Sequence, residues 1–135
     1  MMPVVRELVG KRALIVEDNF LVGLLLEEQM TSLGFEVVGM VPTEKEALGT
    51  IRSGPIDVAL LDINILGGSS EGVARRLQEL AVPFIFVSGY ASPNVLSPDL
   101  QEHTRLNKPV NERELGDTLV RTLAGRGRSG GTLSG

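Results

Sequence analysis

The chain has 135 residues, of which 42% are hydrophobic and 22% charged, and its formal net charge is −4. This length suits one domain with a continuous core. The absence of Cys excludes disulfides, thiolate metal sites and cysteine nucleophiles, and it suits a reducing compartment, so we expect a cytoplasmic protein. The sequence shows no signal peptide and no apolar run long enough for a membrane span. It also lacks a basic stripe, so nucleic acid and membrane are not expected as direct partners.

Apolar runs of strand length alternate with segments of helical period from the start of the chain. Residues 12–16 form a nearly continuous apolar run, typical of a strand buried on both faces, and this run ends at Glu17 and Asp18. Apolar residues then recur at helical spacing over 22–33, and Gly34 stands where a left-handed residue commonly ends a helix. The segment predicts a strand followed by a helix.

The same order repeats in the next segment. A second strand is predicted over 35–41, and Thr43 and Glu46 have the spacing of a capping box at the start of a helix. That helix is expected to end at the Gly54-Pro55 break. The first part of the chain therefore predicts strand, helix, strand, helix.

Two further strands are predicted in the middle of the chain. The first covers 56–61 and ends on Asp62, and a loop rich in Gly and Ser then leads to a helix around 73–80. The second covers 84–87, where aromatic and β-branched residues alternate, and it ends on Ser88. Both strands thus place a polar side chain directly at their carboxyl end.

The last segments are predicted from weaker patterns. Residues 93–102 suggest a loop with a short helix, and 104–106 suggest a fifth strand. Asn111 and Glu114 repeat the capping-box spacing ahead of a helix that is expected to end near Gly125.

Five strands alternating with five helices predict an α/β fold. We expect a five-stranded, parallel, doubly wound sheet with right-handed crossovers and helices on both faces. The domain is predicted over residues 11–124, after an N-terminal extension of residues 1–10. Residues 125–135 are rich in Gly, Ser and Thr and are predicted to be a flexible tail.

The polar residues that follow the strands predict a site. Open α/β sheets bind ligands at the carboxyl ends of their strands, so these side chains are expected to share one edge. The residues at this predicted edge are Glu17, Asp18, Asp62, Asn64, Ser88 and Lys108.

Three carboxylates at one edge repel each other unless a cation joins them. Oxygen ligands favour a hard ion, and open coordination positions suit Mg²⁺ shared with a phosphoryl oxygen. Asp18 and Asp62 would be direct ligands, together with the backbone carbonyl of Asn64. Glu17 would act through water. The prediction is a magnesium site.

The remaining polar residues predict phosphoryl chemistry at this edge. Lys108 would supply a positive charge to a phosphoryl oxygen, and Ser88 a hydroxyl donor. Asp62 would then be the nucleophile that accepts the phosphoryl group. Taken singly, each of these residues is explained as well by a turn, a helix cap or a helix start. Their joint occurrence at one edge favours the functional interpretation.

Four short motifs resemble the receiver domains of two-component response regulators. The resemblance covers about residues 11–124 and implies a flavodoxin-like fold of the CheY type. It also implies Mg²⁺-dependent transfer from the phosphohistidine of a sensor kinase or phosphotransfer protein to Asp62, and slow loss of the phosphoryl group to water. The residues carried over are Glu17, Asp18, Asp62, Ser88 and Lys108. The motifs are LIVEDN (14–19), LLDIN (60–64), FVSG (86–89) and NKP (107–109).

The chain departs from the usual receiver pattern in its signalling elements. Residues 65–70 replace the Met-Pro pair and the acid-Gly turn that usually follow the acceptor, so a more mobile loop is expected. Arg105 stands where most receivers have an aromatic switch residue. Residues 86–90 resemble the Phe-Ala-Thr-Gly-Tyr subgroup, whose members are often single domains. Tyr90 is therefore a candidate switch residue with Ser88, the alternative being simple packing of its ring.

The helix after Glu17 and Asp18 carries more apolar residues than its packing face needs. These residues predict contact with a kinase helix or with a second copy in a homodimer, and the alternative is a wide buried face. They are Phe20, Leu21, Leu24 and Leu25.

Three other functions compete with this interpretation. An aspartyl-phosphate phosphatase would need a second Asp where the chain has Asn64, so we expect a signalling protein and not an enzyme with turnover. A flavin carrier would need a phosphate loop where Glu17 and Asp18 repel anions. A receiver-like interaction module that is never phosphorylated remains the alternative. Output is expected to pass to an unknown downstream protein, or the chain drains phosphoryl groups from a relay.

Overall fold

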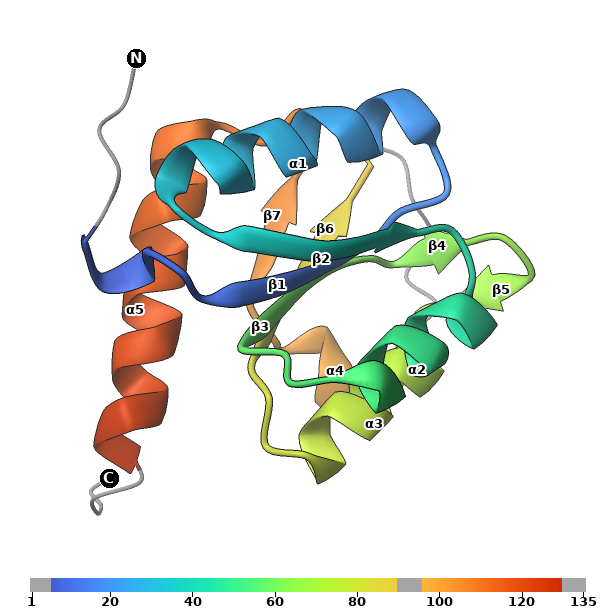
Figure 1. Ribbon diagram of the computed structural model, residues 1–135. Helices are drawn as coiled ribbons and strands as arrows, with labels where there is room; N and C mark the ends of the chain where they lie inside the picture. The colour runs from blue at the N-terminus through green and yellow to red at the C-terminus, as the bar shows by residue number, and fades with distance from the viewer. Residues whose placement is uncertain (1–5, 90–95, 130–135) are drawn as a thin grey trace.

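The computed structural model describes residues 6–89 and 96–129, with side chains described up to residue 124. Five strands form one parallel sheet in the order β2-β1-β3-β6-β7 (Figure 1). The predicted α/β fold is confirmed. The strands of this sheet are β1 (Arg12–Val16), β2 (Glu36–Val41), β3 (Val58–Asp62), β6 (Phe84–Ser88) and β7 (Arg105–Asn107).

Helices cover both faces of the sheet (Figure 1). One apolar core contains residues of α1 and α5, and the other contains residues of α2, α3 and α4. Because both faces are covered, the central strands are buried throughout, which explains their continuous apolar sequences. The helices are α1 (Phe20–Leu33), α2 (Glu44–Ser53), α3 (Glu71–Glu79), α4 (Pro98–Gln101) and α5 (Glu112–Ser129).

The predicted helix ends depend on local contacts that the structure contains. Gly34 ends α1 in the left-handed conformation, with φ of 113°, and its N–H bonds back into the helix. The hydroxyl of Thr43 accepts from the backbone N–H of Glu46 at 3.2 Å, and Asn111 Oδ1 accepts from the N–H of Glu114 at 3.0 Å. These caps confirm the starts predicted for α2 and α5.

The segment after Asp62 differs from the predicted loop. It forms a short antiparallel pair, β4 (Asn64–Ile65) with β5 (Gly68–Ser69). Gly67 at the turn has φ of 90°, which favours glycine. The turn residues that predicted a loop therefore close a hairpin.

Both ends of the domain extend beyond the predicted bounds. A 3₁₀ turn, η1 (Arg6–Leu8), precedes β1, and its Leu8 is fully buried in the core under α1 and α5. Part of the predicted extension thus packs as core. At the other end, α5 continues to Ser129, past the end predicted near Gly125. Within the described residues, no helix has the length and apolar character needed to cross a membrane.

Candidate functional site

Three acidic side chains meet where β1 and β3 end. The two strands are paired in parallel, with Val16 beside Leu61, so the next residues along them, Glu17 and Asp62, also lie side by side. Asp18 follows Glu17 directly. Carboxylate oxygens of all three residues lie within 4.8 Å of one another. The parallel register therefore produces the acidic cluster that the strand ends predicted.

The three carboxylates differ in their surroundings. Glu17 and Asp62 are only 3% and 6% exposed, whereas Asp18 is open to solvent. Glu17 Oε2 accepts a hydrogen bond from the backbone N–H of Asn19 at 3.0 Å. Asn19 in turn caps α1, because its Oδ1 accepts from the N–H of Val22 at 3.0 Å. The start of α1 thus fixes the orientation of Glu17.

Lys108 supplies the positive charge at the cluster. Its Nζ lies 2.7 Å from Glu17 Oε1 and 3.2 Å from Asp62 Oδ2. The backbone N–H of Lys108 donates to the carbonyl of Ser88 at 2.9 Å, which joins the segment after β7 to the end of β6. The peptide bond between Lys108 and Pro109 is cis. The contact of Lys108 with Glu17 Oε1 is an ion pair between the lysine ammonium and a buried carboxylate. Sequence reasoning placed Lys108 at this edge but missed its pairing with Glu17, for which the sequence holds no local signal.

Burial dominates the electrostatics of Asp62. It raises the pKa of Asp62 to about 7, and a hydrogen bond with Glu17 and repulsion from Glu17 act in the same direction. The nearby Lys108 ammonium lowers this pKa, without overcoming the other effects. For Lys108 itself, burial lowers the pKa, but the bonds and charges of Glu17 and Asp62 outweigh burial and raise it. Asp62 is therefore poised to lose its proton when a cation approaches.

The cluster fits a divalent cation. Three carboxylates face one ammonium, which leaves an excess of negative charge. Asn64 begins β4 two positions after Asp62, on the chain that leaves the cluster. An all-oxygen donor set of this kind suits Mg²⁺ better than softer metals.

The structure gives different outcomes for the three predicted switch residues. Ser88 is buried at the end of β6, on the strand next to Asp62, where β3 and β6 pair in register. Arg105 is exposed on β7 opposite Phe86 and has no part in the acidic cluster. Tyr90 lies outside the described residues. Of the two that the structure describes, Ser88 lies at the edge that carries Asp62 and Arg105 does not.

Comparisons with known proteins point to one family. Residues 13–120 match the family model described as the response regulator receiver domain. An uncharacterized transcriptional regulatory protein, YrkP of Bacillus subtilis (strain 168), is 30% identical over 115 residues, which are 83% of this chain and 49% of the relative. The chain thus spans about half the length of that curated relative.

Two solved structures show the same likeness. SdrG from Sphingomonas melonis Fr1 is 33% identical with a TM-score of 0.71, covering 87% of this chain and 96% of SdrG. A CheY-like receiver domain protein from Methanospirillum hungatei JF-1 is 27% identical with a TM-score of 0.77, covering 89% of this chain and 98% of the other. With the family match, the five-stranded fold and the acidic edge in agreement, the chain belongs to the response regulator receiver domain family of two-component signalling.

Proposed function

We propose that this receiver accepts a phosphoryl group on Asp62 from a phosphohistidine of a sensor kinase or histidine phosphotransfer protein. The observation that carries this proposal is the contact of Lys108 with Asp62 inside the cluster of Glu17, Asp18 and Asp62. One carboxylate that is buried beside a lysine and next to a cation site has the surroundings that a phosphoryl acceptor needs.

In the proposed reaction, a carboxylate oxygen of Asp62 attacks phosphorus while the bond from phosphorus to the imidazole nitrogen breaks. The electron pair stays on that nitrogen. Mg²⁺, bound by Asp18, Asp62 and the carbonyl of Asn64, with Glu17 acting through water, would neutralise charge on the phosphoryl oxygens. Lys108 is positioned to pair with one of these oxygens, and the hydroxyl of Ser88 would donate to another. Attack requires ionised Asp62, which Lys108 favours.

The proposed output is a changed protein surface, not catalytic turnover. Phosphorylation is proposed to draw Ser88 toward Asp62 and to shift a pre-existing equilibrium in the segment from Tyr90 to Arg105. The motif at residues 86–90 is consistent with the Phe-Ala-Thr-Gly-Tyr subgroup. The receiving protein is a downstream partner, or the chain serves as a phosphate sink. The competing function is an interaction module that works without phosphorylation.

Intact mass measurement after incubation with acetyl phosphate and Mg²⁺ tests the acceptor. We expect one phosphoryl adduct on the wild type and none on Asp62→Asn, because the amide oxygen is a poor nucleophile. Asp117→Asn, on the exposed side of α5, is the matched control and should keep the adduct. A wild type without adduct, or an undiminished adduct on Asp62→Asn, contradicts the proposal.

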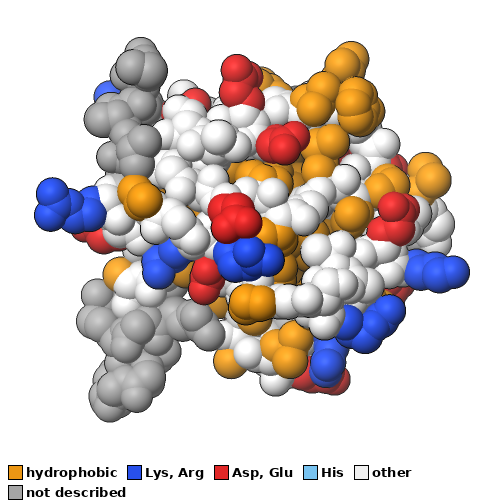
Figure 2. All heavy atoms as spheres, in the orientation of Figure 1, with side chains coloured by type: hydrophobic (Ala, Val, Ile, Leu, Met, Phe, Trp, Pro, Cys, Tyr) orange, Lys and Arg blue, Asp and Glu red, His pale blue; other side chains and the backbone are white. Residues whose placement is uncertain are grey.

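An exposed apolar patch lies beside the proposed acceptor, at the start of α1. Phe20 and Leu21 are 66% and 75% exposed, and Figure 2 shows hydrophobic side chains gathered over this end of the helix. The alternative of a wide buried face is therefore wrong for Phe20, Leu21, Leu24 and Leu25. We propose that this α1 patch, defined by those four residues, contacts the phosphohistidine donor. A second copy of the chain is the other candidate.

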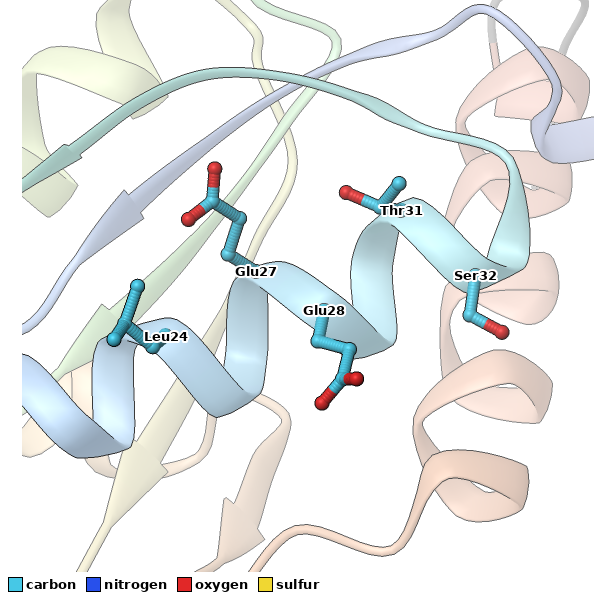
Figure 3. A pocket seen from close by; sticks show the side chains of 5 residues that line it. All are labelled: Leu24, Glu27, Glu28, Thr31 and Ser32. Atoms are coloured by element: carbon cyan, nitrogen blue, oxygen red, sulfur yellow. The ribbon is translucent and has the colours of Figure 1, made fainter.

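A hollow of about 610 Å³ lies along α1 and shares Leu24 with the α1 patch (Figure 3). Its lining contains two carboxylates and no basic side chain. It is therefore a surface feature of α1 and not the phosphoryl site. The lining residues are Leu24, Glu27, Glu28, Thr31 and Ser32.

Charged substitutions test the α1 patch. Leu21→Glu and Leu24→Glu are expected to slow transfer from a phosphorylated histidine phosphotransfer protein about tenfold or more, because each places a charge in an apolar contact. Labelling by acetyl phosphate should stay unchanged, since this donor needs no docking surface. Leu80→Glu, at the end of α3, is the control. Equal transfer rates for all variants would argue against the contact.

A further inference from the structure

A polar cluster outside the phosphoryl site joins the start of α3 to the start of α4. The carboxylate of Glu71 accepts two hydrogen bonds from Ser97, one from its backbone N–H at 3.0 Å and one from its hydroxyl at 2.6 Å. Arg75 donates to both oxygens of Asp99, at 2.6 and 3.0 Å, and to Glu71 at 3.2 Å. We call these four residues the α3–α4 clamp.

Both the apolar core and this clamp hold α4 in place. The helix has four residues, too few to be stable alone. Ser97 stands directly before α4, yet its side chain makes no capping bond to the helix and instead donates to Glu71. Leu96 and Leu100 supply the apolar contacts on this side of the sheet, and the clamp supplies polar contacts between the start of α4 and α3.

The clamp connects to Asp62 by a short backbone route. Ile63 is the next residue after Asp62, and its carbonyl accepts from the N–H of Ser70 at 3.0 Å, which closes the chain over the β4–β5 hairpin. Ser70 is buried and directly precedes Glu71. The route from Ile63 to Glu71 therefore consists of one hydrogen bond and one peptide link, both within the described residues.

We infer that Glu71 is a positioning residue that couples the phosphorylation state of Asp62 to the placement of α4. This inference rests on the proposed function. Most receivers carry an aromatic switch residue where this chain has Arg105. Arg105 is exposed on β7 and is not part of the acidic cluster. The route through Ile63, Ser70 and Glu71 gives the chain a physical link from the site to the α4 face. Ionised Glu71 is favoured at neutral pH, because the bonds from Ser97 lower its pKa.

Amide NMR with Mg²⁺ and beryllofluoride, a phosphoryl mimic, tests the coupling. In the wild type we expect shifts near the site, at Ile63 and Ser88, and distant shifts in α4, at Leu100 and Gln101. In Glu71→Ala the shifts near the site should persist, while the distant shifts fall below half of the wild-type values. Glu71→Gln keeps one oxygen acceptor for Ser97 and should give intermediate distant shifts.

A matched control lies on the same helix. Glu79 forms an exposed ion pair with Arg76 at 2.8 Å, so Glu79→Ala should behave like the wild type. Distant shifts of full size in Glu71→Ala, or their absence in the wild type while Ile63 and Ser88 shift, would overturn the inference. If the mimic shifts neither Ile63 nor Ser88 in the wild type, the proposed function itself fails, and this outcome is distinct from the other two.

Discussion

Replacing Lys108 with alanine is expected to slow phosphorylation of Asp62 by acetyl phosphate about 100-fold or more, in the range found when one charge-stabilising donor is removed from an active site. The reason is the loss of the Nζ that lies 3.2 Å from Asp62 Oδ2. The same change removes a positive charge from the acidic cluster, so affinity for Mg²⁺ should rise. Rates from intact mass and Mg²⁺ titration by calorimetry measure these opposite effects.

Slower phosphorylation together with tighter Mg²⁺ binding distinguishes a specific effect of Lys108→Ala from general damage to the fold, which would weaken both. Without metal, Lys108→Ala should lower the free energy of unfolding by about 2–3 kcal/mol, because Glu17 and Asp62 lose their counter-charge. Added Mg²⁺ should restore part of the lost stability. Lys45→Ala, on the exposed surface of α2, should change neither rate nor affinity. Weaker Mg²⁺ binding in Lys108→Ala would contradict the role assigned to this lysine.

The second large effect concerns stability and pH. In the folded protein the pKa of Asp62 is raised from 3.8 to about 7, so between these values the folded state binds a proton that the unfolded chain has lost. The proton bound by Asp62 therefore stabilises the folded state. Its contribution to the free energy of unfolding is largest below pH 3.8, decreases as the pH rises from about 4 to about 7, and then levels off. Its slope is at most about 1.4 kcal/mol per pH unit.

Denaturant titrations of metal-free wild type and Asp62→Asn at several pH values measure this contribution. Other carboxylates titrate in both proteins, so the difference between the two isolates Asp62. We expect Asp62→Asn to be more stable by about 1–3 kcal/mol at pH 8 and to gain little at pH 4. Mg²⁺ should reduce the difference, since it stabilises the ionised carboxylate. A difference that is independent of pH would contradict the raised pKa.

Most of the fold could be predicted because its signals are local. The buried central strands β3 and β6 appear as continuous apolar runs, and Gly34 and Thr43 form the predicted caps. The predicted helix end near Gly125 was less accurate, since glycine only weakens a helix and α5 continues to Ser129. The loop after Asp62 was assigned from its turn residues alone, which also suit the hairpin that forms.

Some features of the candidate site could also be predicted from the sequence, and others could not. That Glu17 and Asp62 would share an edge followed from their positions after parallel strands. The pairing of Lys108 with Glu17 did not follow, because it depends on how the chain after β7 returns to β1. The exposure of Phe20 and Leu21 was also undecided, since apolar residues around a helix are compatible with a wide buried face.

The order of strands and helices, the helix caps and the polar residues at the strand ends could be predicted from short stretches of sequence, because they depend on backbone preferences and on neighbours within a few positions. The contacts of Lys108 with Glu17 and Asp62, and of Glu71 with Ser97, became visible in the folded structure. Those contacts join residues far apart in the chain, so they depend on strand register and helix packing, which no short pattern of residues encodes.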